Sequence, residues 1–166
     1  MNIPKVHYGV LIGFLEVLDD GGGKSDVVSI ASRQGLQLDD LLPILESGEM
    51  LGLIKVDSGD VALTEKGHLL IAASPKVKKK ILRDMISDLE AFRKIIDLIK
   101  QSGKDSVTKQ DIVDFLSKED TLSASSQDPT GDFNWIIEWG RQALILKYDA
   151  NSESVSLRTN KQTSQT

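Results

Sequence analysis

The sequence predicts a mostly helical α+β fold made of two winged-helix-like units joined by a helical segment. Apolar residues recur at helical spacing along most of the chain, and a set of helical stretches is twice followed by two short β-type runs around turn residues. Three helices followed by a β-hairpin is the order of a winged helix, a variant of the helix-turn-helix. We expect one unit in residues 1–74, the connector and second unit in 75–158, and a disordered tail in 159–166.

Three helices are expected at the start of the first unit. The first covers residues 6–19 and ends at the glycines that follow, since glycine readily takes the left-handed conformation of a helix end. The second is short, with Ser25 as its N-cap and Gly35 at its end. The third runs from about residue 38 to 52. Its apolar face is predicted to hold Leu41, Leu42 and Leu45.

A hairpin is expected to complete the first unit. Residues 53–57 and 61–63 are β-type runs that flank an Asp-Ser-Gly-Asp turn. Thr64 is then placed to cap a further helix over residues 65–73.

The connector begins at Pro75, and its apolar residues alternate three and four apart, as in a heptad seam. This pattern fits one long helix, but the segment from Ser87 to Glu90 has the order of a capping box. We favour two helices that meet near Ser87. The seam suits either the core or a homodimer interface, and we favour the core.

The second unit repeats the order of the first. We expect a helix over residues 107–118, a mobile Ser-rich loop over 119–131, a helix over 132–142, and a hairpin of 144–148 with 155–157. The run Ile145-Leu146-Lys147-Tyr148-Asp149 parallels Leu53-Ile54-Lys55-Val56-Asp57, which indicates one supersecondary unit used twice.

Composition argues against several classes of function. The chain has no cysteine, so disulfides and thiolate metal sites are excluded, and its two histidines lie in no metal-binding pattern. No apolar stretch of about 18 residues occurs, and the first residues lack the features of a signal peptide. We therefore expect a cytoplasmic protein without metal or cofactor.

One stretch looks like a phosphate-binding loop. Gly23-Lys24-Ser25 matches the end of that motif, but Leu18 stands where the motif requires its first glycine. The run also follows a helix, whereas the motif follows a strand. We interpret it as a turn. Neither His7 nor His68 has a catalytic motif around it, so we expect no enzyme activity.

Charge is distributed unevenly along the chain. The net charge is −5 overall, but it is −6 in residues 1–74, +5 in 75–104 and −4 in 105–166. The strongest basic cluster fits either a solvated helix face or a docking surface for an acidic partner or anionic lipid headgroups. This candidate interaction surface consists of Lys76, Lys78, Lys79, Lys80 and Arg83.

The third helix of a winged helix is the one that reads DNA. In the first unit this helix carries no basic residue, and phosphates would repel its carboxylates. Nucleic-acid binding is therefore disfavoured, although a winged-helix transcriptional regulator stays the alternative function. The carboxylates are those of Asp39, Asp40, Glu46 and Glu49.

The block Trp139-Gly140-Arg141, followed by Leu146-Lys147-Tyr148-Asp149, resembles the C-terminal AAA-associated domain. That family is found after the ATP-binding subunit of ABC transporters of the nitrate/sulfonate/taurine type. The likeness extends from about Val6 to Leu157 and includes Leu38-Asp39-Asp40-Leu41-Leu42-Pro43-Ile44. Two features depart from the family pattern: Gln142 replaces a tyrosine, and the loop at 123–132 suggests that the last helix begins late.

The resemblance implies a regulatory or protein-interaction module associated with an ABC transporter ATP-binding subunit, with Trp139, Gly140 and Arg141 as the family signature. Peripheral membrane association and a homodimer are both compatible with it. The sequence leaves open the transported substrate, any effector, and whether the chain is free-standing or part of a longer subunit.

Overall fold

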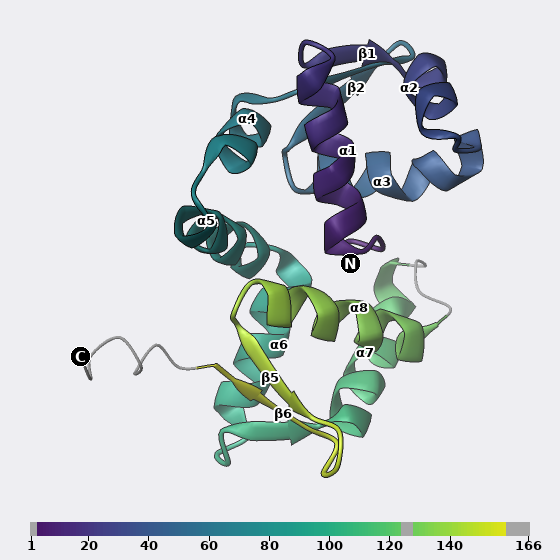
Figure 1. Cartoon of the computed structure of the whole chain (residues 1–166). Coiled ribbons are helices and arrows are strands. Elements are labelled where there is room, and N and C mark those ends of the chain that lie inside the picture. The colour runs from purple at the N-terminus through teal and green to yellow at the C-terminus, as the bar shows by residue number, and fades with distance from the viewer. Residues whose placement is uncertain (1–2, 124–127, 159–166) are drawn as a thin grey trace. The chain divides into compact units, whose positions relative to one another are not determined.

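The computed structural model describes residues 3–123 and 128–158, and its contacts separate Pro4–Ile81 from Leu82 onward. We call these the first and second units; their boundary falls inside a helix, α5 (Pro75–Ser87). Each unit combines helices with one small antiparallel sheet, which confirms the predicted fold class (Figure 1). The predicted tail, residues 159–166, lies outside the described residues.

In the first unit, helices pack around a three-stranded sheet with the order β1-β3-β2. The core is formed by α1, α3 and the inner face of the sheet, where Leu15, Leu53 and Val61 have no exposed surface. Its elements are α1 (Tyr8–Asp20), β1 (Lys24–Asp26), α2 (Val27–Gln34), α3 (Leu38–Met50), β2 (Ile54–Asp57), β3 (Asp60–Leu63) and α4 (Glu65–Ala72), followed by the first turns of α5.

The second unit has the same topology, with the sheet order β4-β6-β5. Ile112, Ile136, Trp139 and Val155 are completely buried in its core. After the last turns of α5, its elements are α6 (Glu90–Gln101), β4 (Ser106–Thr108), α7 (Lys109–Ser123), α8 (Pro129–Gln142), β5 (Leu146–Asp149) and β6 (Ser154–Leu157).

Each sheet contains one strand that the sequence analysis missed. β1 pairs with β3 through Lys24 opposite Ala62, and β4 pairs with β6 through Ser106 opposite Ser156. Residues 107 and 108 are therefore strand, and the helix that was expected to include them begins at Lys109. Both strands have only three residues, too few to show an alternating pattern.

Two expected helix caps were wrong. The cap of α2 is Asp26, whose Oδ1 accepts a hydrogen bond of 3.0 Å from the Ser29 N–H. Ser25 instead lies in β1, where its hydroxyl accepts a 2.8 Å hydrogen bond from Arg33 Nη2. The connector does form two helices, as favoured, but α6 begins after Leu89 and not with a box at Ser87.

The loop predicted over residues 119–131 was also wrong in its extent. α7 continues to Ser123, and α8 begins at Pro129 instead of starting late. Asp128 caps α8, because its Oδ1 accepts a 3.0 Å hydrogen bond from the Gly131 N–H. Proline fits the first helical position, where its missing N–H leaves no bond unmade. Residues 124–127 of the predicted loop lie outside the described residues.

Candidate interaction surfaces

The Trp139-Gly140-Arg141 block fastens α8 to the hairpin of the second unit. Trp139 is fully buried. Gly140 lies so close to β5 that a Cβ there would be 2.5 Å from Leu146 Cδ1. Arg141 Nη2 donates a 3.1 Å hydrogen bond to the Tyr148 carbonyl, and its guanidinium lies 5.7 Å from the centre of that ring. All three residues therefore have a structural role: they connect the end of α8 to the hairpin. We call this connection between helix and strand the joint.

The first unit contains the same joint with different side chains. Gly48 occupies the position of Gly140, and a Cβ there would be 2.7 Å from Ile54 Cδ1. Glu49 follows it and accepts a 3.3 Å hydrogen bond from the Val56 N–H. Helix and strand are therefore joined in both units by a glycine and by one charged side chain bonded to the strand backbone.

The glycine run after α1 is a helix end, in agreement with its interpretation as a turn. The Gly23 N–H donates a 2.8 Å hydrogen bond to the Leu18 carbonyl, and the chain then enters β1. His68 Nδ1 lies 3.3 Å from Asp19 Oδ1 and its ring lies beside Gly23. Among the described residues, no group of three or more His, Cys, Asp or Glu side chains is arranged to hold a metal ion.

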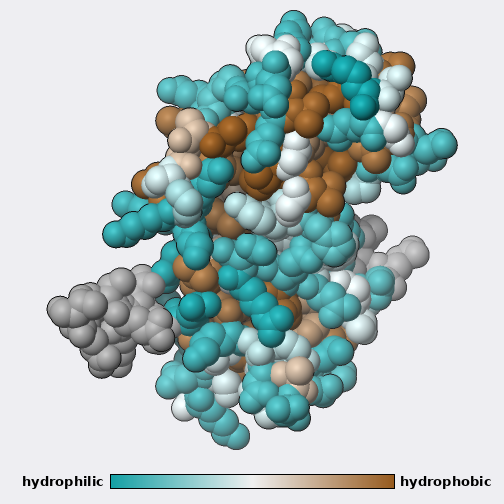
Figure 2. Space-filling model, viewed as in Figure 1, coloured by the Kyte–Doolittle hydropathy of each residue, from teal (hydrophilic) through white to brown (hydrophobic). Residues whose placement is uncertain are grey.

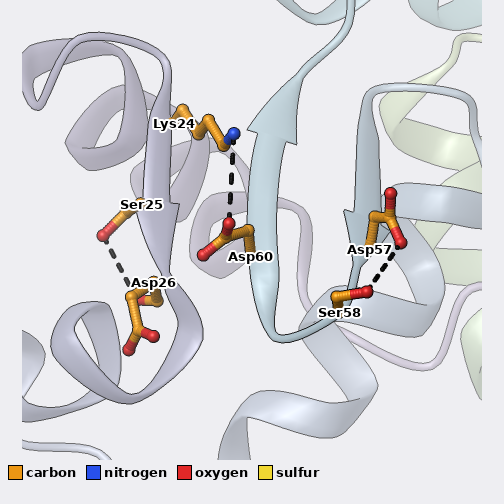
Figure 3. Close-up of polar contacts among 6 residues, drawn as sticks. All are labelled: Lys24, Ser25, Asp26, Asp57, Ser58 and Asp60. Carbon is orange, nitrogen blue, oxygen red and sulfur yellow. Dashed lines mark hydrogen bonds and ion pairs between the residues drawn. The ribbon is translucent and has the colours of Figure 1, made fainter.

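The outer face of the first sheet is charged, and Figure 3 shows its polar contacts. Lys24 and Lys55 lie on either side of Ala62, and Lys24 Nζ is 3.9 Å from Asp60 Oδ2. Asp57 accepts a 3.2 Å hydrogen bond from the Ser58 hydroxyl at the hairpin turn. These side chains line a depression of about 290 Å³ that contains two lysines and two aspartates. Such a surface has no basic stretch for phosphates to follow.

Helix α5 gathers most of the predicted basic cluster on one side. Lys76, Lys79, Lys80 and Arg83 are spaced i, i+3, i+4 and i+7, which is one face of a helix. Lys78 lies apart from them, in line with the buried Leu82. Within the described parts of the chain, the ammonium groups of Lys76, Lys79 and Lys80 have no carboxylate at ion-pair distance, and all three residues are exposed. These three lysines of the basic stripe are therefore available to bind an external anion.

Helix α3 exposes a second surface, opposite in charge to the stripe on α5, that the sequence analysis did not identify. Leu42, which was assigned to the apolar face, is 52% exposed, as is Leu38. The buried face is formed instead by Leu41, Ile44 and Leu45. Only the four-residue spacing of Leu38 and Leu42, on a different side from Leu41, could have shown this in the sequence.

The hydropathy view agrees that the surface is mixed: apolar surface shows between hydrophilic side chains in the first unit (Figure 2). None of the helices in the described segments combines the length and apolar character needed to cross a bilayer.

The fold is that of a tandem winged-helix protein, in which each unit combines helices with one small antiparallel sheet. The family model described as the C-terminal AAA-associated domain matches residues 28–149, most of the chain, and the chain therefore belongs to this family. Its members are, by that description, domains associated with ATPase modules. No curated protein and no solved structure matches the chain significantly.

Proposed function

We propose that this chain is a non-catalytic regulatory or protein-interaction module that binds the ATP-binding subunit of an anion- or sulfonate-importing ABC transporter on the cytoplasmic side. Membership of the C-terminal AAA-associated domain family is the observation that carries this proposal. The structure is compatible with it, because the signature residues Trp139, Gly140 and Arg141 build the fold and leave the helix faces for partners.

The basic stripe of α5 is the surface that would bind the ATPase subunit. Its lysines have no partner within the described residues, while both flanking regions of the chain are acidic. An acidic patch on the subunit would be attracted by this stripe, with a rate of association that falls as salt rises.

The test is a pull-down and an ATPase assay with the ATP-binding subunit of an anion-type ABC transporter from the same genome. We expect binding and a changed ATPase rate, both lost in the variant Lys76→Glu/Lys79→Glu/Lys80→Glu. A charge-matched control, Lys55→Glu/Lys104→Glu/Lys147→Glu, changes three exposed lysines elsewhere and should retain both. If the wild-type chain neither binds the subunit nor changes its rate, the proposal is wrong.

Two other readouts separate this function from its alternatives. The winged-helix topology favours DNA binding, but α3 presents carboxylates where a DNA reader has basic groups. We expect no mobility shift of duplex DNA even at low salt, and a salt-dependent shift would establish the alternative. Co-sedimentation with anionic vesicles that requires Lys76, Lys79 and Lys80 would show a lipid partner instead of a protein.

A further inference from the structure

The exposed side of α3 combines two leucines with three carboxylates. At 100° per residue, Leu38 and Leu42 share an arc of the helix, and the acidic side chains fall on the same arc within about a quarter of a turn. The opposite side is buried against the core. The carboxylates on the exposed arc belong to Asp39, Glu46 and Glu49.

Most carboxylates of α3 on this exposed side do not help to hold the fold together. Asp40 closes the helix start by accepting a hydrogen bond of 3.4 Å from the Gln37 N–H, and Glu49 bonds to β2. By contrast, Asp39 and Glu46 have no cation at ion-pair distance within the described residues. Their charges contribute nothing to the joint between helix and sheet.

The two leucines of this face are also largely exposed to solvent. Leu38 and Leu42 each keep 52% of their surface exposed, and Val28 on the neighbouring α2 keeps 63%. Single exposed apolar residues are ordinary, but two on one helix face form a ready anchor for another helix. Burying these leucines in a complex would remove apolar surface from water, which favours binding.

We propose that this face of α3 binds an amphipathic helix of a partner protein, one with apolar side chains for Leu38 and Leu42 and with lysine or arginine for Asp39 and Glu46. Charge complementarity selects this occupant, because the carboxylates repel nucleic acids and anionic membranes. The acidic surface that suits α5 would also be repelled here. The inference rests on the proposed function only in taking the partner to be a protein.

The experiment is an NMR titration of the full ¹⁵N-labelled chain with synthetic 14-residue helical peptides. One peptide has a leucine face and a lysine face, a second replaces lysine by glutamate, and a third has the first peptide's composition in scrambled order. We expect the first peptide to shift the amides of α3 and of Val28, with much weaker effects from the other two. Shifts of equal size from all three peptides, or shifts confined to other elements, would overturn the proposal.

Variants of side chains on this face provide a second test, because Leu38 and Leu42 do not belong to the buried core. We expect Leu38→Ser/Leu42→Ser to weaken the first peptide's affinity at least tenfold. Asp39→Asn/Glu46→Gln should weaken it severalfold at low salt and flatten its salt dependence. Leu69→Ser is the matched control, because Leu69 is 59% exposed on α4. Unchanged affinity in the Leu38→Ser/Leu42→Ser variant would sink the idea.

The two proposals fail separately. Binding of the ATPase subunit depends on α5 and is read by pull-down, whereas the peptide titration needs no subunit. A chain that binds the subunit but shows no peptide shifts on α3 keeps the proposed function and loses this inference.

Discussion

The two units share a backbone frame but fill it with different side chains. In the first unit the Leu53 N–H donates a 2.9 Å hydrogen bond to the Gly48 carbonyl, and in the second the Ile145 N–H donates one of 2.8 Å to the Gly140 carbonyl. These bonds turn the end of the third helix into the hairpin in the same way. The repeat is therefore preserved in backbone geometry more strictly than in sequence.

The residue that follows each of these glycines is charged, but the sign of the charge differs between the two units. Glu49 accepts a hydrogen bond from the N–H of Val56, while Arg141 donates one to the carbonyl of Tyr148, the equivalent strand residue. Each strand residue offers both a donor and an acceptor, so either charge sign can make the joint. The signature Arg141 is therefore one of two kinds of side chain that can make this bond. The other kind, Glu49 in the first unit, adds a negative charge to α3.

The largest expected difference in stability between the units comes from substitution of the residue before Gly48 or Gly140. Trp139→Ala should destabilise the second unit by about 3–5 kcal/mol, because it empties a fully buried ring. Ser47→Ala, at the equivalent place in the first unit, should cost about 1 kcal/mol or less. Hydrogen exchange followed by NMR reports each unit's stability separately. Equal losses from the two variants would contradict the idea that tryptophan anchors only the second core.

The glycines themselves should be the next most sensitive. Gly140→Ala and Gly48→Ala each force a Cβ into a strand side chain, at 2.5 and 2.7 Å from the nearest atom. We expect each to cost about 1–3 kcal/mol in urea denaturation. Gly13→Ala is the control, since nothing lies within 4 Å of its added Cβ and alanine favours a helix. A neutral result at either joint would mean that the strand can move away.

A smaller effect is expected where the units differ in backbone strain. Gly52 has φ of 72°, and the second unit places Leu144 at φ of 57° in the same turn. Gly52→Ala should cost about 1–2 kcal/mol, because a Cβ is disfavoured in the left-handed region. Gly52→Asn should cost less, since asparagine tolerates this conformation. If both variants melt like the wild type, strain in this turn is unimportant.

The smallest expected effect concerns the charged side chains. Arg141→Met removes an exposed hydrogen bond and should lower the stability of the second unit by about 1 kcal/mol. Glu49→Gln keeps an oxygen that can accept from Val56 and should leave the first unit's melting temperature unchanged. A larger loss from Glu49→Gln than from Arg141→Met would show that charge, and not the bond to the strand, matters at this position.

The repeated helices and hairpins were predictable because their apolar residues are periodic and their turns carry glycine. β1 and β4 were not, since Lys24-Ser25-Asp26 is a polar triplet that becomes a strand only through pairing with residues far along the chain. The start of α8 was missed for a different reason. Asp128 and Pro129 form a standard helix start, but the serines around them suggested a loop.

The candidate surfaces were only partly predictable. Lysine spacing identifies the stripe on α5 directly, and its role in binding stays a prediction. The exposed side of α3 was missed because Leu41, Leu42 and Leu45 look alike in a sequence, and only packing decides which of them faces the core. The family signature was recognised in the sequence. Its structural role in connecting helix and strand became visible only from the distances in the structure.

In each sheet a short strand, β1 or β4, covers an edge of the hairpin that would otherwise be unpaired. β1 covers one edge of β3, and β4 covers one edge of β6, each over three residues. If such a strand detaches, a hairpin with an unpaired edge remains, and an unpaired edge is a template for a strand of another chain. Because β1 is only three residues long, this opening should be the least costly one in the sheet. A short, polar covering strand such as Lys24-Ser25-Asp26 makes a poor nucleus for intermolecular pairing even when it comes free.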